Sequence, residues 1–269
     1  MKIILFIALI FFQASSVVAL EKATFDGLIS SIQNKHFEEV EKFLENNKST
    51  LKNDPEYYVI LINYTFSKAD QSHLVVAQGT PQEGDWALQD TKTGKNVGFM
   101  GPRSVFDGAI IKNCISSVNN ALPNFEDRLD IHFGLVVLAE QSKDWTIIGN
   151  QLVQIIETSK RIHNKWDWGS INSMTDEPKK FMLDNIQSRL TKMFYADTEL
   201  ADNAMIKVSE SLIQHYPESI YGYANLGTYY FAKNEYEKAK EYYKAALNID
   251  PDDSIVTANL KKINDMTKD

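Results

Sequence analysis

The stretch from Ser219 to Asp252, SIYGYANLGTYYFAKNEYEKAKEYYKAALNIDPD, decides the fold of this chain. Small and large side chains recur in it at helical spacing, which predicts two antiparallel helices joined by a turn. Gly227 and Ala239 lack bulk, so the two helices can approach closely. The side chains expected to fill the space around that contact are Tyr223, Leu226, Tyr230 and Tyr243. Pro251 suits the first turn of a following helix, because the N–H group that proline lacks has no helical partner there.

This order of aromatic, Leu-Gly, aromatic, small, aromatic, small and Pro resembles the tetratricopeptide repeat. The resemblance implies an all-α solenoid of stacked helix pairs over residues 20–269, in which 219–252 is the clearest repeat and 253–267 a capping helix. Such repeats are scaffolds for binding rather than for a particular chemistry. A protein or peptide partner is therefore expected, and the sequence does not identify it.

Hydrophobic periodicity predicts further helices before this repeat. They span 24–34, 37–47, 54–68, 104–122, 127–141, 145–162, 177–195 and 201–215. Between the third and fourth of these helices the period changes, and short apolar stretches alternate with Gly, Pro and Asp. We expect a small β-hairpin or three-stranded ribbon at 71–101, inserted between the two helices of one repeat. Because an isolated ribbon is marginal in water, it should lean on neighbouring helices.

The first 19 residues have the layout of a secretory signal peptide. Lys2 precedes an apolar run at 3–12, and Val17-Val18-Ala19 resembles a small-residue cleavage site. The run is short for a membrane span, which favours cleavage before Leu20 over the alternative of a retained membrane tether. We expect an exported chain, in the periplasm or outside a bacterial cell, with no integral membrane segment once the signal is removed.

The charge balance is acidic, with 28 basic and 36 acidic residues and a net charge of −8. This balance disfavours nucleic acids and anionic membrane surfaces as partners. Cys114 is the single cysteine, so no intramolecular disulfide can form and the core must supply the stability.

Two further features extend the resemblance. The stretch 128–134 and a loop at 163–177 that contains Trp166 and Trp168 resemble, together with the ribbon, a group of exported bacterial tetratricopeptide-repeat proteins. That group has no assigned biochemical activity. The resemblance therefore implies a fold and an exported location but no class of enzyme.

The first candidate binding site lies on the first helix of the clear repeat. First helices line the concave face of such solenoids. Helical spacing places a set of side chains away from the packed face: Tyr221, Ala224, Asn225, Thr228 and Phe231. Asn225 can hold a peptide backbone or carboxylate there, with Lys262 as the one candidate for a nearby cation. The alternative is that these side chains only contact the neighbouring helix.

The second candidate is the loop with Trp166 and Trp168. Two residues apart in an extended segment, both rings would lie on the same side. Exposed, they would form an anchor for a partner or for a sugar ring, so the alternative function is a small-ligand or glycan-binding envelope protein. The other interpretation is that the rings fold back and fill the end of a stretched repeat.

Signatures of catalysis are weak in this sequence. Cys114 lies on an apolar helical stripe, which is typical of a buried structural thiol. The five histidines lack metal-ligand spacing, and the ribbon glycines do not precede a helix as in a phosphate loop. A hydrolase would need a polar cleft with two titratable groups within hydrogen-bond reach. We therefore expect no enzyme, no cofactor and no metal, and a scaffold that binds a peptide or helix segment in its groove.

Overall fold

The computed structural model describes residues 19–81, 83–103, 105–169 and 177–267. Over these residues the chain forms eleven α-helices and one three-stranded antiparallel sheet, which confirms the predicted helical repeat fold with a small ribbon. The predicted signal peptide lies outside the described residues except for Ala19. Among the described helices, none combines the length and the apolar character that a membrane crossing requires.

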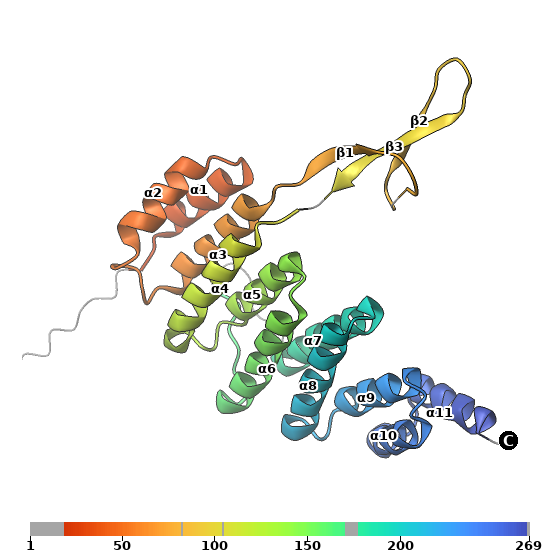
Figure 1. Ribbon diagram of the computed structural model, residues 1–269. Coiled ribbons are helices and arrows are strands. Elements are labelled where there is room, and N and C mark those ends of the chain that lie inside the picture. The colour runs from red at the N-terminus through yellow and green to blue at the C-terminus, as the bar shows by residue number, and fades with distance from the viewer. Residues whose placement is uncertain (1–18, 82, 104, 170–176, 268–269) are drawn as a thin grey trace, which may run out of the picture.

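The helices follow one another as antiparallel pairs in a curved array (Figure 1). The pairs are α1 (Lys22–Gln33) with α2 (Phe37–Asn47), α3 (Pro55–Ala69) with α4 (Gly108–Ala121), α5 (Leu129–Ser142) with α6 (Trp145–Arg161), α7 (Pro178–Ala196) with α8 (Glu199–His215), and α9 (Ile220–Ala232) with α10 (Tyr236–Ile249). A 3₁₀ turn, η1 (Leu122–Asn124), follows α4, and α11 (Ser254–Met266) ends the array.

Short polar side chains set the starts of many of these helices. The residue before each such helix accepts hydrogen bonds from free N–H groups of the first turn, which is the capping that helix starts require. These residues are Asp54, Asp107, Asp144, Thr198, Ser219 and Asp253. Pro55 and Pro178 occupy first turns, where a proline costs no hydrogen bond.

The clear repeat is packed as its sequence predicts. A Cβ atom added at Gly227 would lie 2.5 Å from Cδ1 of Tyr243, so α9 and α10 meet face to face at this glycine. Tyr243 and Ala239 are fully buried. They belong to a core of α9–α11 that is separate from the main core, which runs from α1 to Tyr216 at the end of α8.

The ribbon consists of β1 (His73–Ala77), β2 (Trp86–Gln89) and β3 (Asn96–Arg103), in the order β1-β3-β2. Its insertion between α3 and α4 is as predicted, although β3 runs two residues past 101. The expectation that it leans on neighbouring helices is wrong. Among the described residues no strand packs against a helix, and the ribbon projects away from α3 and α4 (Figure 1).

Contacts within the ribbon and at its base take the place of helix packing. Asp85 and Arg103 form an ion pair at 2.7 Å across the sheet, and the carboxylate of Asp85 is almost fully buried. At the base, the ring of Phe106 lies 5.7 Å from that of Phe66 on α3. Together with the ladder of the central strand β3, these contacts hold the ribbon at its root.

Candidate partner-binding groove

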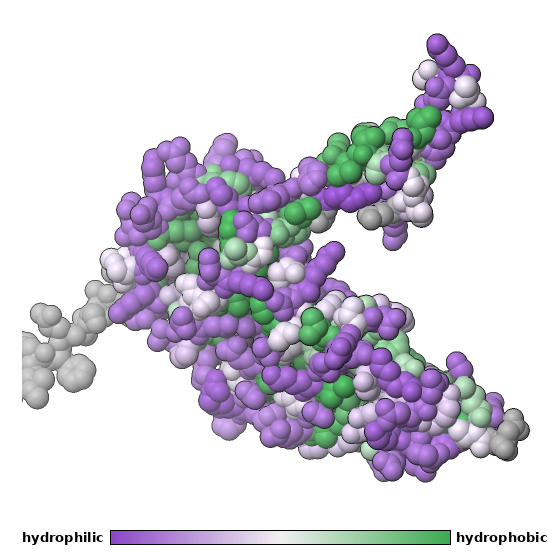
Figure 2. Space-filling view, viewed as in Figure 1, coloured by the Kyte–Doolittle hydropathy of each residue, from purple (hydrophilic) through white to green (hydrophobic). Residues whose placement is uncertain are grey.

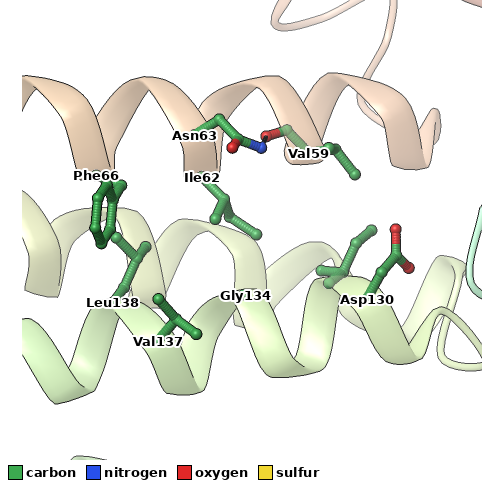
Figure 3. Close-up of a pocket in the computed structure, with 9 residues that line it drawn as sticks. Val59, Ile62, Asn63, Phe66, Asp130, Gly134, Val137 and Leu138 are labelled. Carbon is green, nitrogen blue, oxygen red and sulfur yellow. Dashed lines mark hydrogen bonds between the residues drawn. The ribbon is translucent and has the colours of Figure 1, made fainter. Parts of the chain in front are cut away.

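An apolar groove lies between α3 and α5, the first helices of two consecutive pairs. Its cavity has a volume of ≈ 360 Å³, and the side chains of the two helices point toward one another across it (Figure 3). The lining residues are Val59, Ile62, Asn63 and Phe66 from α3, and Asp130, Ile131, Gly134, Val137 and Leu138 from α5. First helices form the concave face of a repeat solenoid, so this α3–α5 groove opens on the face where such scaffolds bind.

The width of the groove depends on a glycine. A Cβ atom at Gly134 would come within 3.2 Å of Cγ2 of Ile62, which is closer than an ordinary contact. Ile62 therefore lies directly over the glycine and forms the floor of the groove. Val59 and Val137 are half-buried at its sides, and Phe66 is 38% exposed at one end. An apolar side chain of a partner would thus meet a floor and two walls of the same character.

A buried arginine fixes the other end of the groove. The guanidinium of Arg128 donates to both carboxylate oxygens of Asp130, at 2.9 and 2.7 Å, and to Oε1 of Glu56 at 2.9 Å. The backbone of Gly169, with φ +76°, covers it so closely that a Cβ atom there would lie 2.4 Å from Nη2. Because Glu56 belongs to α3 and Asp130 to α5, the arginine holds the two walls of the groove together.

The ribbon carries an exposed apolar surface of its own. Val76 on β1 pairs with Met100 on β3, which in turn pairs with Trp86 on β2, so the three side chains share one face of the sheet. Leu74 lies on the same face, two residues from Val76. Leu74, Val76 and Trp86 are 61%, 67% and 58% exposed, and Figure 2 shows apolar surface gathered along the ribbon. Exposed apolar patches of this kind mark interaction sites.

The predicted residues of α9 do not converge on one groove. Asn225 forms an amide pair with Gln187 of α7, with distances of 2.7 and 3.1 Å, and the hydroxyl of Tyr221 donates to Asp184 of the same helix at 2.7 Å. Both side chains thus contact the neighbouring helix, as in the alternative interpretation. The α3–α5 groove was not predicted, although Phe133-Gly134 repeats the large-small pair of Leu226-Gly227.

Two more residues of that set, Thr228 and Phe231, contact the C-terminal part of the chain. Thr228 donates to the carbonyl of Ala224 at 2.9 Å, and its hydroxyl lies 3.1 Å from that of Tyr243. The ring of Phe231 packs beside Lys262 of α11, whose Nζ lies 5.4 Å from the ring centre. Lys262 therefore approaches an aromatic ring of α9 rather than the amide of Asn225.

The tryptophan loop folds back on the helices. Trp166 is 6% exposed, and its ring lies 5.3 Å from that of His132 on α5. Trp168 is half-buried, with its ring 5.2 Å from that of Phe181 on α7. Trp166 is therefore part of the core and offers no surface to a sugar ring. The expected exposed anchor thus lacks one of its two rings. Residues 170–176 of the loop lie outside the described part of the chain.

Burial favours the neutral forms of two titratable side chains in the core, Cys114 and His132. Cys114 is buried, and burial raises the pKa of its thiol to about 11. Burial likewise lowers the pKa of His132 to about 4, and Nε2 of its ring contacts the carbonyl of Glu126 at 2.9 Å. The described residues contain no cluster of three or more His, Cys, Asp or Glu side chains that could hold a metal ion.

Comparison with known families matches part of this chain. The model of the tetratricopeptide repeat matches residues 220–253, which are α9, α10 and the turn that follows. No curated protein matches the chain. The chain thus contains a tetratricopeptide repeat at the position where its sequence predicts one, and repeats of this kind generally mediate interactions between proteins.

Proposed function

We propose that this chain is an exported scaffold for protein–protein interaction, which binds an apolar peptide or helical segment of its partner in the α3–α5 groove. The observation that carries the proposal is the groove itself, an apolar cavity between two first helices of the repeat array. The tetratricopeptide repeat at 220–253 supports binding of a protein. The signal-peptide layout of residues 1–19 supports export.

The dimensions of the groove favour an anchor side chain over a complete small ligand. Its ≈ 360 Å³ is near the lower end of ligand cavities, which span roughly 300–1,000 Å³. Binding between proteins depends on a few large side chains that enter such pockets and lose their water. A Leu, Phe or Met side chain projecting from the partner would contact Ile62, Val59 and Val137 together.

The ribbon enlarges the surface available to the same partner. The groove ends at Phe66, whose ring meets Phe106 at the root of the ribbon. A segment that lies in the groove and continues past Phe66 reaches the exposed face with Leu74 and Val76. The combined contact is larger than the groove alone provides, and larger interfaces exclude water from the anchor more completely.

The decisive experiment places a photoreactive phenylalanine analogue at Phe66, in the full chain expressed in its native host. We expect a cross-linked protein partner that is lost when Val137→Arg places a charged side chain in the groove. Ile255→Arg, at an exposed apolar position on α11, is the matched control and should leave the cross-link intact. Circular dichroism must show equal helix content for both variants. A cross-link that survives Val137→Arg would place the binding site elsewhere.

A further inference from the structure

A buried carboxylate lies at the start of α3. Asp54 is 6% exposed and caps the helix, with Oδ1 accepting the backbone N–H of Glu56 at 2.8 Å. Its other oxygen, Oδ2, accepts from the backbone nitrogen of Leu20 at 2.5 Å. Over the described part of the chain, no ion pair connects Asp54 to a lysine, an arginine or a histidine. The carboxylate is thus held by two backbone donors, one in the helix that it caps and one, Leu20, that precedes Asp54 by 34 residues.

Such a carboxylate is costly to bury without a positive charge beside it. Removing an ionised carboxylate from water is strongly unfavourable unless hydrogen bonds and a counter-charge replace the lost hydration. The start of α3 offers N–H groups and the positive end of the helix dipole, which replace part of the hydration that the carboxylate loses. The missing part is a counter-charge. The nitrogen of Leu20 lies where a positive charge would provide it.

Leu20 is also the residue that the sequence places directly after a cleavage site. Its side chain is half-buried against the main core. Leu20 precedes Glu21, the N-cap residue of α1, whose first hydrogen bond joins Phe25 to Glu21. Ala19, the preceding residue, is exposed. The position of the Leu20 nitrogen is therefore fixed by core packing on one side and by Asp54 on the other.

We infer that Leu20 is the N-terminal residue of the mature protein and that its α-ammonium group forms a buried ion pair with Asp54. Hydrolysis of the Ala19–Leu20 bond by a signal peptidase uses one water molecule: its hydroxyl joins the carbonyl carbon of Ala19, and its remaining proton goes to the nitrogen of Leu20. At neutral pH the new amine binds one further proton from solvent. Three N–H donors and a positive charge then face Asp54, where the uncut chain offers one neutral N–H.

The cleavage part of this inference rests on the exported location in the proposed function, whereas the ion pair does not. Two measurements separate them. The first is the intact mass of the protein isolated from its native host, which should correspond to a chain that begins at Leu20. A mass that includes residues 1–19 would contradict processing, and a mass that begins at another residue would contradict the assigned cut.

The second measurement tests the ion pair in protein made as a cleavable fusion, so that export plays no part. One form begins at Leu20 after the fusion is removed, and the other keeps Gly-Ser before Leu20 and has an amide N–H there. We expect the form with free Leu20 to melt about 2–4 °C higher, as a modest stabilisation would produce in a domain of this size.

Asp54→Asn is the matched control, because Asn caps helices about as well as Asp and removes only the charge. In this variant the two forms should melt at the same temperature. Equal melting of the two parent forms, or a difference that persists in Asp54→Asn, would overturn the ion pair whatever the mass of the native protein.

Discussion

Replacement of Gly227 by alanine tests the packing that defines the clear repeat. The added Cβ atom would lie 2.5 Å from Cδ1 and 2.6 Å from Cε1 of Tyr243, whereas carbon atoms in favourable contact are roughly 3.5–4.0 Å apart. The tyrosine ring has no room to move, because it is fully buried. Its hydroxyl lies 3.1 Å from both Thr228 and Asn259, which fixes its far end as well. The helices α9 and α10 must therefore separate.

The expected loss combines two opposing effects. Overpacking a core by one methyl group destabilises by about 1–3 kcal/mol, while Ala is favoured over Gly inside a helix by about 0.5–1 kcal/mol. A net loss of about 1–2 kcal/mol in the free energy of unfolding remains. Because α9–α11 have their own core, we expect the loss to appear as local opening of this part of the chain.

Hydrogen exchange followed by mass spectrometry resolves that local opening. Amides of α9 and α10 should exchange roughly 5–30-fold faster in Gly227→Ala, while those of α5 and α6 keep their rates. Gly27→Ala in α1 is the control, since no described atom lies within 4 Å of the added Cβ and the helix should gain stability. Unchanged exchange in α9 and α10 would refute the packing argument.

Two further predictions concern buried polar groups. Tyr216→Phe should lower the free energy of unfolding by about 0.5–1.5 kcal/mol in denaturant melts, because it removes the hydrogen bond that the hydroxyl donates to Asn164 Oδ1 at 2.6 Å, and that oxygen then keeps only the Ser159 hydroxyl, at 2.8 Å, as a donor; an unchanged midpoint would contradict this. For His132, burial lowers the pKa from 6.5 to about 4, so the unfolded chain binds more protons between these values and stability should fall as the pH falls through that interval. The loss amounts to roughly 3 kcal/mol at most, and His132→Gln should show a flatter pH dependence of the melting temperature if the histidine is responsible.

The sequence predicts the clear repeat well because its contacts are local. Gly227 and Tyr243 are 16 positions apart within one helix pair, so residue size at helical spacing defines their contact directly. The ribbon is predicted for a similar reason, since a change of hydrophobic period at 71–101 is visible in the sequence alone. Its projection away from the helices is not visible there, because it depends on the ion pair between Asp85 and Arg103 and on the absence of helix contacts over the described residues.

The α3–α5 groove could not be predicted for the opposite reason. Its floor depends on the contact between Ile62 on α3 and Gly134 on α5, which are far apart in the sequence, and the inserted ribbon separates them further. Periodicity predicts on which side of its helix Asn225 lies, but it does not predict which other helix packs against that side. The structure places Gln187 there, and the amide pair engages the side chain of Asn225, which stays partly exposed. Gly134, as a small residue after Phe133, was the one local signal of the groove.

The ribbon differs from the rest of the chain in its charge, and it lies close in sequence to the end of the α3–α5 groove. Residues 71–82, which include β1, contain no Asp, Glu, Lys or Arg, although the chain as a whole is 24% charged. Exposed edge strands in soluble proteins usually carry charges that prevent pairing with other chains, and β1 has none. This uncharged stretch begins five residues beyond Phe66, which lies at one end of the α3–α5 groove. The other edge strand, β2, also has no charged residue, so both edges of the ribbon lack the charges that usually prevent pairing. This supports the proposal that the insertion adds to the surface offered to a partner in the groove.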